Sequence, residues 1–111
     1  MDKNLSAMDK DLYKRVDEVL HYIWDPSGIS HEPHSRDEYE HYIPQVFHLL
    51  QHDEPLEQIV NYLLFVEEEE IGINPDHANA DRTAEILYEH MKKVRADYAD
   101  RNPADKENKV S

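Results

Sequence analysis

The sequence predicts an all-α protein that folds as a compact bundle of about four helices. In four segments the apolar residues recur every three or four positions, which is the period of an amphipathic helix. Glycine occurs only at Gly28 and Gly72, and both fall between periodic segments. The 111 residues suffice for one hydrophobic core but not for two. We expect a single helical domain over residues 7–101, with disordered ends at 1–6 and 102–111.

The first helix is expected from Met8 to Trp24, because one apolar stripe runs along this segment. The chain then reads Asp-Pro-Ser-Gly, and this order of Asp, Pro and Gly suits a type I turn. The residues expected to shape the turn are Trp24, Asp25, Pro26 and Gly28.

The second helix is expected from Ser35 to about His52. Ser35 and Glu38 have the spacing of a capping box. Pro44 lies inside the segment, lacks a backbone donor and clashes with the carbonyl of Glu40. The sequence therefore predicts a helix that is kinked or briefly broken at Pro44.

The third helix is expected to start near Asp53, with Pro55 in its first turn. Residues 62–66 are apolar all round, which is typical of a central helix that is buried on several sides. Phe65 lies opposite the apolar stripe, so it is exposed if the helix is not central. Four glutamates follow, of which Glu67 falls near the stripe and Glu69 points outward.

A turn with Gly72 as the C-cap is expected to close the third helix. The last helix is expected from Asn79 or Asp81 to Tyr98. His90 falls within its apolar stripe, where a lone histidine is most often a hydrogen-bonded core residue.

The chain is strongly acidic, with 25 acids, 12 bases and a net charge of −13. Residues 36–72 hold ten of the acids and Arg36 as the one base. This charge argues against binding to nucleic acid or to anionic lipid. The sequence also has no apolar run of membrane-spanning length and no secretory h-region, so we expect a cytoplasmic protein.

No catalytic motif is present, so we expect neither an enzyme nor a cofactor. The chain has no GxSxG, no HExxH, no phosphate-binding glycine loop and no cysteine. The Glu-x-x-His pairs that end at His21 and His41 have the spacing found in two-metal helical bundles. Their helical phase, however, predicts that both histidines face water.

His48 and His52 are weak candidates for a metal site. Residues four apart on a helix can place two imidazoles on one ion. The sequence shows no definite third ligand, although Asp53 or Glu54 would serve. The loop adds a second histidine pair, His31 and His34.

Several segments resemble a group of small bacterial helical proteins of unknown function. The shared features are a Trp-Asp-Pro turn (YIWDPSGIS, residues 22–30) and the Asp-Glu-Tyr helix that follows it (RDEY, residues 36–39, and YIPQVF, residues 42–47). The turn at 67–73 and the last helix from Ala84 fit the same pattern. The resemblance covers roughly residues 12–95, and the loop HEPH at 31–34 departs from it. Some members are immunity-like proteins found beside toxins, so the resemblance implies such a role here.

These observations predict a small acidic binding protein, immunity-like, that neutralises a basic toxin or docks a similar basic partner. Acids would pair with the partner's lysines and arginines, and an exposed aromatic residue would anchor the contact. The residues predicted to bind the partner are Asp37, Glu40, Glu54, Glu57, Phe65, Glu68 and Glu69. A homo-oligomeric or regulatory module and a histidine-based metal-binding protein remain as alternatives, and a concentrated acidic surface also serves solubility.

Overall fold

The computed structural model describes residues 5–29 and 37–101, and the prediction of an all-α fold is confirmed. The described part contains four α-helices and no strand. It also contains two π-helical turns, η1 and η3, and one 3-10 turn, η2. In chain order the elements are α1 (Ala7–Val19), η1 (Leu20–Trp24), η2 (Glu40–Tyr42), α2 (Ile43–Gln51), α3 (Leu56–Phe65), η3 (Val66–Ile71) and α4 (His77–Arg101).

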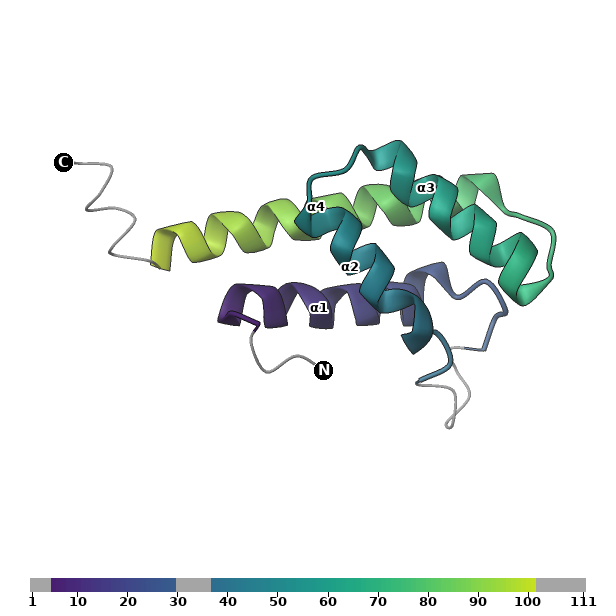
Figure 1. Ribbon diagram of the computed structural model, residues 1–111, viewed down its shortest axis with the longest axis horizontal. Coiled ribbons are helices and arrows are strands. Elements are labelled where there is room, and N and C mark those ends of the chain that lie inside the picture. Colours follow the sequence, from purple (N-terminus) through teal and green to yellow (C-terminus); the bar gives the residue numbers. More distant parts are fainter. Residues whose placement is uncertain (1–4, 30–36, 102–111) are drawn as a thin grey trace.

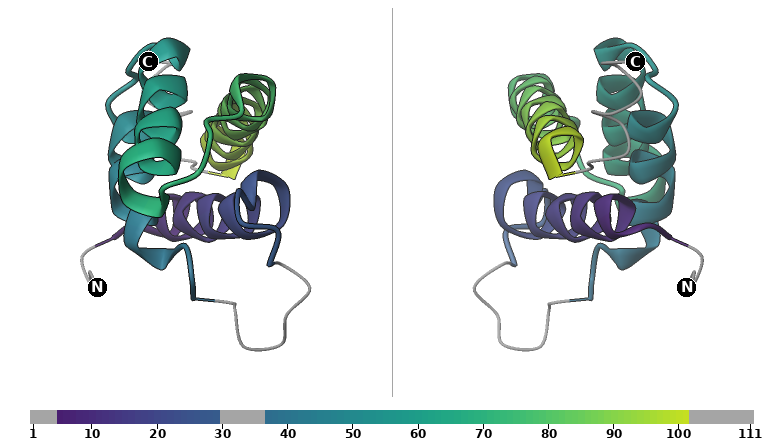
Figure 2. Two further views of the ribbon diagram at one scale, coloured as in Figure 1. Left: turned by 90° about the vertical axis from the view of Figure 1, so that its right-hand side faces the viewer. Right: turned by 90° about the vertical axis from the view of Figure 1, so that its left-hand side faces the viewer.

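The helices form two layers. Figure 1 shows α4 running back alongside α1 in the opposite direction, and its last turns extend past the start of α1. Figure 2 shows α2 and α3 standing side by side on the other side of the bundle. Because α4 packs against both α1 and α3, it joins the two layers.

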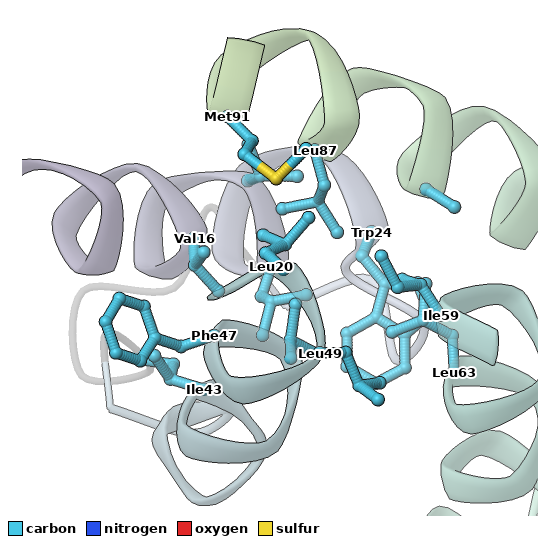
Figure 3. Close-up of a cluster of buried hydrophobic side chains, with 14 of the residues drawn as sticks. Val16, Leu20, Trp24, Ile43, Phe47, Leu49, Ile59, Leu63, Leu87 and Met91 are labelled. Atoms are coloured by element: carbon cyan, nitrogen blue, oxygen red, sulfur yellow. The ribbon is translucent and has the colours of Figure 1, made fainter. Parts of the chain in front are cut away.

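The core lies between the layers and draws on all four helices (Figure 3). Apolar side chains from α1, α3 and α4, such as Val16, Leu63 and Leu87, are fully buried. Trp24 is the largest buried side chain and is 1% exposed. The apolar stripes predicted from the sequence therefore supply the core.

Both α1 and α3 end in a π-helical turn, which the sequence analysis did not anticipate. Each of these turns is closed by a residue in the left-handed region, Asp25 (φ 33°) after η1 and Gly72 (φ 83°) after η3. The amide of Asp25 donates to the carbonyl of Leu20, and that of Gly72 donates to the carbonyl of Glu67. Gly72 is thus the helix C-cap that the sequence predicts.

The expected irregularity at Pro44 takes the form of a change of helix type. The 3-10 turn η2 ends at Tyr42, and α2 begins at Ile43 with Pro44 in its first turn. At that position the missing N–H of proline has no carbonyl partner to lose. The capping box expected at Ser35 lies outside the described residues.

The third helix is not central, contrary to the expectation from its apolar run. One side of α3 faces the core through Ile59 and Leu63, whereas Phe65 on the other side is 51% exposed. The apolar run reflects side chains at the edges of the core, because Tyr62 and Leu64 are partly buried and pack against it.

The boundaries of the helical unit differ by a few residues from those expected. Ser6 caps α1 by accepting a hydrogen bond from the amide of Asp9, and Leu5 packs against the core. At the other end, α4 starts at His77 and continues to Arg101. The expected disorder at residues 1–4 and 102–111 lies outside the described residues. Within the described ranges, no helix is both long enough and apolar enough to cross a membrane.

We predict that Gly72→Ala destabilises the protein by about 1–2 kcal/mol, because an L side chain is strained at positive φ. Open space surrounds the position where a Cβ would lie, so the cost comes from the backbone and not from a clash. Urea unfolding measures this difference. Gly72→Asn is the matched control and should lose less, since asparagine tolerates the left-handed region better. Equal losses for both variants would contradict this account of the turn.

Candidate functional site

The acidic run that closes α3 is divided between the inside and the outside of the protein. Glu67 is completely buried, whereas Glu68, Glu69 and Glu70 are exposed. This agrees with the sequence expectation that Glu67 lies near the apolar stripe and Glu69 points outward. A buried carboxyl group requires hydrogen-bond donors around it, and these come from two distant parts of the chain.

Both carboxyl oxygens of Glu67 are hydrogen-bonded. The indole Nε1–H of Trp24 donates to Oε2 at 2.7 Å, and the backbone amide of Asp76 donates to Oε1 at 2.7 Å. The carbonyl of Glu67 also accepts the amides of Gly72 and Ile73. Glu67 therefore joins η1, the turn after η3 and the segment that leads into α4.

Asp25 organises the turn that follows Trp24. Its Oδ1 accepts the amide of Ile29 at 2.9 Å and the hydroxyl of Tyr39 at 2.8 Å. The amide of Gly28 donates to the carbonyl of Asp25, which closes the turn over Pro26 and Ser27 as the sequence predicts. The side-chain amide N–H of Asn79 on α4 donates to the carbonyl of Trp24 at 2.8 Å.

Tyr39 links this turn to the second layer. The pKa of Tyr39 is raised to about 12, mainly by burial; the hydrogen bond from the Ser27 amide lowers the pKa, and the hydrogen bond to Asp25 raises it. Tyr39 is therefore a neutral donor at physiological pH. The Trp24–Asp25 turn is thus held from three sides, by Tyr39, Glu67 and Asn79.

A polar pocket of about 310 Å³ lies beside this junction. Its lining includes the carboxyl groups of Asp25, Glu67 and Asp76 and the amides of Asn74 and Asn79. Nevertheless, no group of three or more His, Cys, Asp or Glu side chains within the described ranges is arranged to hold a metal ion.

A second feature is the solvent side of α3 and η3. Glu57, Asn61 and Phe65 follow one another at four-residue spacing, and Glu68 and Glu69 lie three and four residues beyond Phe65. All five are exposed, and together we call them the outer α3 face. No Lys or Arg of residues 5–29 or 37–99 forms an ion pair with its three glutamates.

The structure brings together four of the seven residues predicted to bind a partner. Glu57, Phe65, Glu68 and Glu69 share the outer α3 face, which answers the open question of whether Phe65 is exposed. Asp37 and Glu40 are exposed around the 3-10 turn η2, and Glu54 is partly buried in the connection between α2 and α3.

Glu40 and Glu54 have other neighbours in the structure. Glu40 lies close enough to Tyr13 of α1 to raise the pKa of that phenol, which burial raises first. The carbonyl of Glu54 accepts the hydroxyl of Tyr88 of α4. These two residues therefore interact with α1 and α4, away from the outer α3 face.

Two tyrosines, Tyr42 and Tyr62, have acidic neighbours. Burial raises the pKa of Tyr42, and the charges of Glu70 and Glu38 raise it further. Burial is also the largest cause of the raised pKa of Tyr62, and electrostatic interactions with Tyr42 and Glu70 raise it further. Glu70 lies 28 residues after Tyr42, and its approach to Tyr42 has no signal in the linear sequence.

One of the two histidines that were expected to face water is buried instead. His41 is exposed as predicted, but the prediction that His21 faces water is wrong, because its side chain is 3% exposed. His21 is buried because α4 packs against η1, so a side of the helix that periodicity assigns to solvent is covered. The Nδ1 atom of His21 has no hydrogen-bond partner within the described part of the chain.

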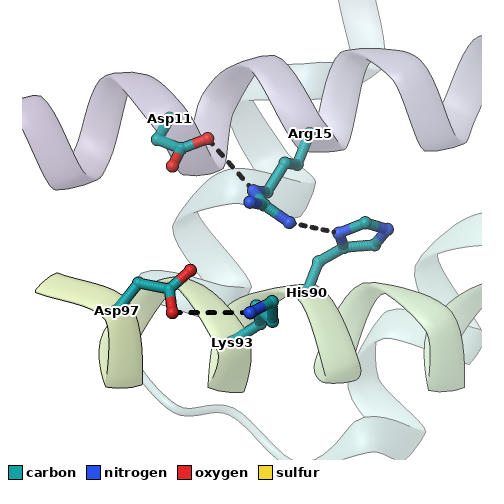
Figure 4. Close-up of polar contacts among 5 residues, drawn as sticks. All are labelled: Asp11, Arg15, His90, Lys93 and Asp97. Atoms are coloured by element: carbon teal, nitrogen blue, oxygen red, sulfur yellow. Dashed lines mark hydrogen bonds and ion pairs between the residues drawn. The ribbon is translucent and has the colours of Figure 1, made fainter.

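His90 lies in a groove between α1 and α4 and forms a polar contact across it (Figure 4). Arg15 donates from Nη1 to Nδ1 of His90 at 2.9 Å and from Nε to Asp11 at 3.0 Å. Burial lowers the pKa of His90 and Arg15 lowers it further, while Glu18 and Asp11 act in the opposite direction. His90 is thus hydrogen-bonded as expected, but it is only partly buried and is not a core residue.

Comparison with known proteins adds no assignment. No protein-family model, no curated protein and no solved structure matches this chain.

We predict that Glu67→Ala lowers the free energy of unfolding by about 3 kcal/mol. The change leaves the buried Trp24 indole N–H and the part-buried Asp76 amide without an acceptor. Glu67→Gln keeps an oxygen for one of the two donors and should cost less. Glu69→Ala, at an exposed position of the same turn, should stay within about 0.5 kcal/mol of the original protein. Chemical denaturation tests the series, and similar values for Glu67→Ala and Glu69→Ala would refute the anchoring role.

We also predict that His90 makes the fold less stable in acid. Because its pKa is lowered in the folded protein, the unfolded chain binds more protons as the pH falls below about 6.5. The contribution of His90 is therefore complete above that pH and is lost below it. In urea unfolding at about pH 7.5, 6.5 and 5.5, the stability of His90→Gln should fall less steeply with decreasing pH than that of the original protein. His77→Gln, an exposed histidine of α4, should not change the slope. Parallel slopes for all three proteins would contradict the prediction.

Proposed function

We propose that this chain is an acidic binding protein that docks a basic partner protein on the outer α3 face, in the manner of an immunity protein that neutralises a toxin. The observation that carries the proposal is the exposure of Phe65, at 51%, between glutamates that have no counter-ion among the described residues. Exposed aromatic residues are frequent anchors of protein interfaces, whereas surrounding charges set orientation and specificity.

The distribution of charge supports this choice of surface. The described residues 37–72 hold ten acids and no Lys or Arg. Two of these acids are engaged within the fold, because Asp53 pairs with Arg95 of α4 and Glu67 is buried beneath Trp24. The three glutamates of the outer α3 face give it a negative field that attracts a cationic surface.

The hydrogen bonds of Glu67 affect the orientation of side chains on the outer α3 face. Its hydrogen bonds to Trp24 and to the amide of Asp76 fix the rotation of η3, so that Glu68 and Glu69 are directed outward next to Phe65. A partner would therefore meet an ordered surface and would lose little free energy in ordering it.

A second copy of the chain is a poorer occupant of the same face at neutral pH. A symmetric dimer through the outer α3 face would bring two sets of three glutamates together. Added salt would screen that repulsion and strengthen self-association, whereas it weakens attraction to a basic partner. The two alternatives thus predict salt effects of opposite sign.

We predict that a basic protein from the native cell lysate is retained on the immobilised chain at about 20 mM salt and released by about 300 mM, since the Debye length shortens from roughly 20 Å to roughly 6 Å. Phe65→Ala should abolish retention, and the triple variant E57Q/E68Q/E69Q should lower the association rate of the isolated pair by at least about tenfold.

Matched controls separate the surface from net charge alone. The triple variant D81N/E85Q/E89Q removes the same number of charges from exposed positions of α4, and Tyr22→Ala removes the other strongly exposed aromatic side chain. Both should bind as the original protein does. Equal effects of the α3 and α4 variants, or retention that increases with salt, would overturn the proposal.

A further inference from the structure

The end of α2 places two imidazole rings against each other. His48 lies on the exposed side of α2 and His52 is its C-cap residue. The amide of His52 donates to the carbonyl of His48 at 3.0 Å, which fixes the two residues one helical turn apart. Their ring centroids lie 4.2 Å from each other with an interplanar angle of 45°.

The two rings are neighbours, and a metal ion requires that one nitrogen of each ring approach a common point. A late first-row ion binds an imidazole nitrogen at about 2.0–2.1 Å, so two nitrogens on one ion lie at most about 4 Å apart. Both side chains are exposed, and the rings can therefore turn their nitrogens toward a common point without displacing core residues. We propose that His48 and His52 together bind a divalent late first-row transition-metal ion as a two-imidazole chelate.

The surroundings define what kind of site this is. Asp53, the nearest carboxylate in sequence, is already paired with Arg95. No third His, Asp or Glu of the described residues joins the two rings in a ligand group. The described residues therefore supply two ligands, and the other coordination positions are open to water. Such a site binds Cu²⁺ more tightly than Ni²⁺ or Zn²⁺, following the usual order for nitrogen ligands.

Three further features favour cation binding here. The net charge of −13 attracts cations to the surface as a whole. Imidazole is also the preferred ligand of copper and zinc among the uncharged side chains. In addition, the second imidazole binds intramolecularly once the first has bound, which raises the affinity above that of a single histidine. The site shares no residue with the outer α3 face and does not depend on the proposed function.

The test is calorimetric titration of the metal-free chain with Cu²⁺ and, separately, Zn²⁺ at about pH 7.5, where imidazole is mostly unprotonated. We expect one ion per chain at this site. His48→Gln and His52→Gln should each weaken binding by at least about tenfold, because only one imidazole remains, and the double variant should abolish binding at this site. Lowering the pH should weaken binding, since protons compete for both nitrogens.

Control variants keep other histidines from giving a false result. His41→Gln and His77→Gln change exposed histidines outside the pair and should leave binding unchanged. The variant H31Q/H34Q removes the other histidine pair of the sequence and should also retain the site. Circular dichroism of each variant confirms that the helices are intact. Absence of heat with both metals, or binding that survives His48→Gln and His52→Gln and is lost in H31Q/H34Q, would overturn the proposal.

Discussion

The burial of the Glu67 carboxyl group beneath the Trp24 indole is the constraint on which the rest of the structure depends. A carboxyl group without exposure is tolerated only where donors satisfy it, and here one donor lies 43 residues earlier in the chain and the other nine residues later. The contact therefore closes the bundle at one end, where η1, η3 and the start of α4 meet. It also decides which glutamates of the acidic run remain at the surface.

This junction was predictable only in part. The sequence predicted the helices, the glycine cap at Gly72 and the inward phase of Glu67, because each follows from local spacing. Periodicity placed His21 in water, whereas the packing of α4 against η1 buries it. The pairing of Trp24 with Glu67 and the approach of Glu70 to Tyr42 arise between distant segments, and single-sequence periodicity carries no information about them.

The same division applies to the candidate site. Composition located the negative charge in the middle of the chain, but it could not separate the acids that support the fold from those available to a partner. The structure makes that separation for Glu67 and Asp53, which are engaged, and for Glu57, Glu68 and Glu69, which surround an exposed Phe65. One buried acid thus gives structural order to the acidic surface that we propose as the docking face.

Hydrogen exchange of the Trp24 indole N–H tests the central claim most directly. The chain has a single tryptophan, so the Nε1–H gives one unambiguous resonance in a ¹⁵N-labelled sample. If Glu67 anchors the junction, this proton should exchange at least about 10³-fold more slowly than a free indole and should share the protection of the most stable core amides. Exchange within about tenfold of the free indole would show that the junction opens independently of the core, and would contradict the account.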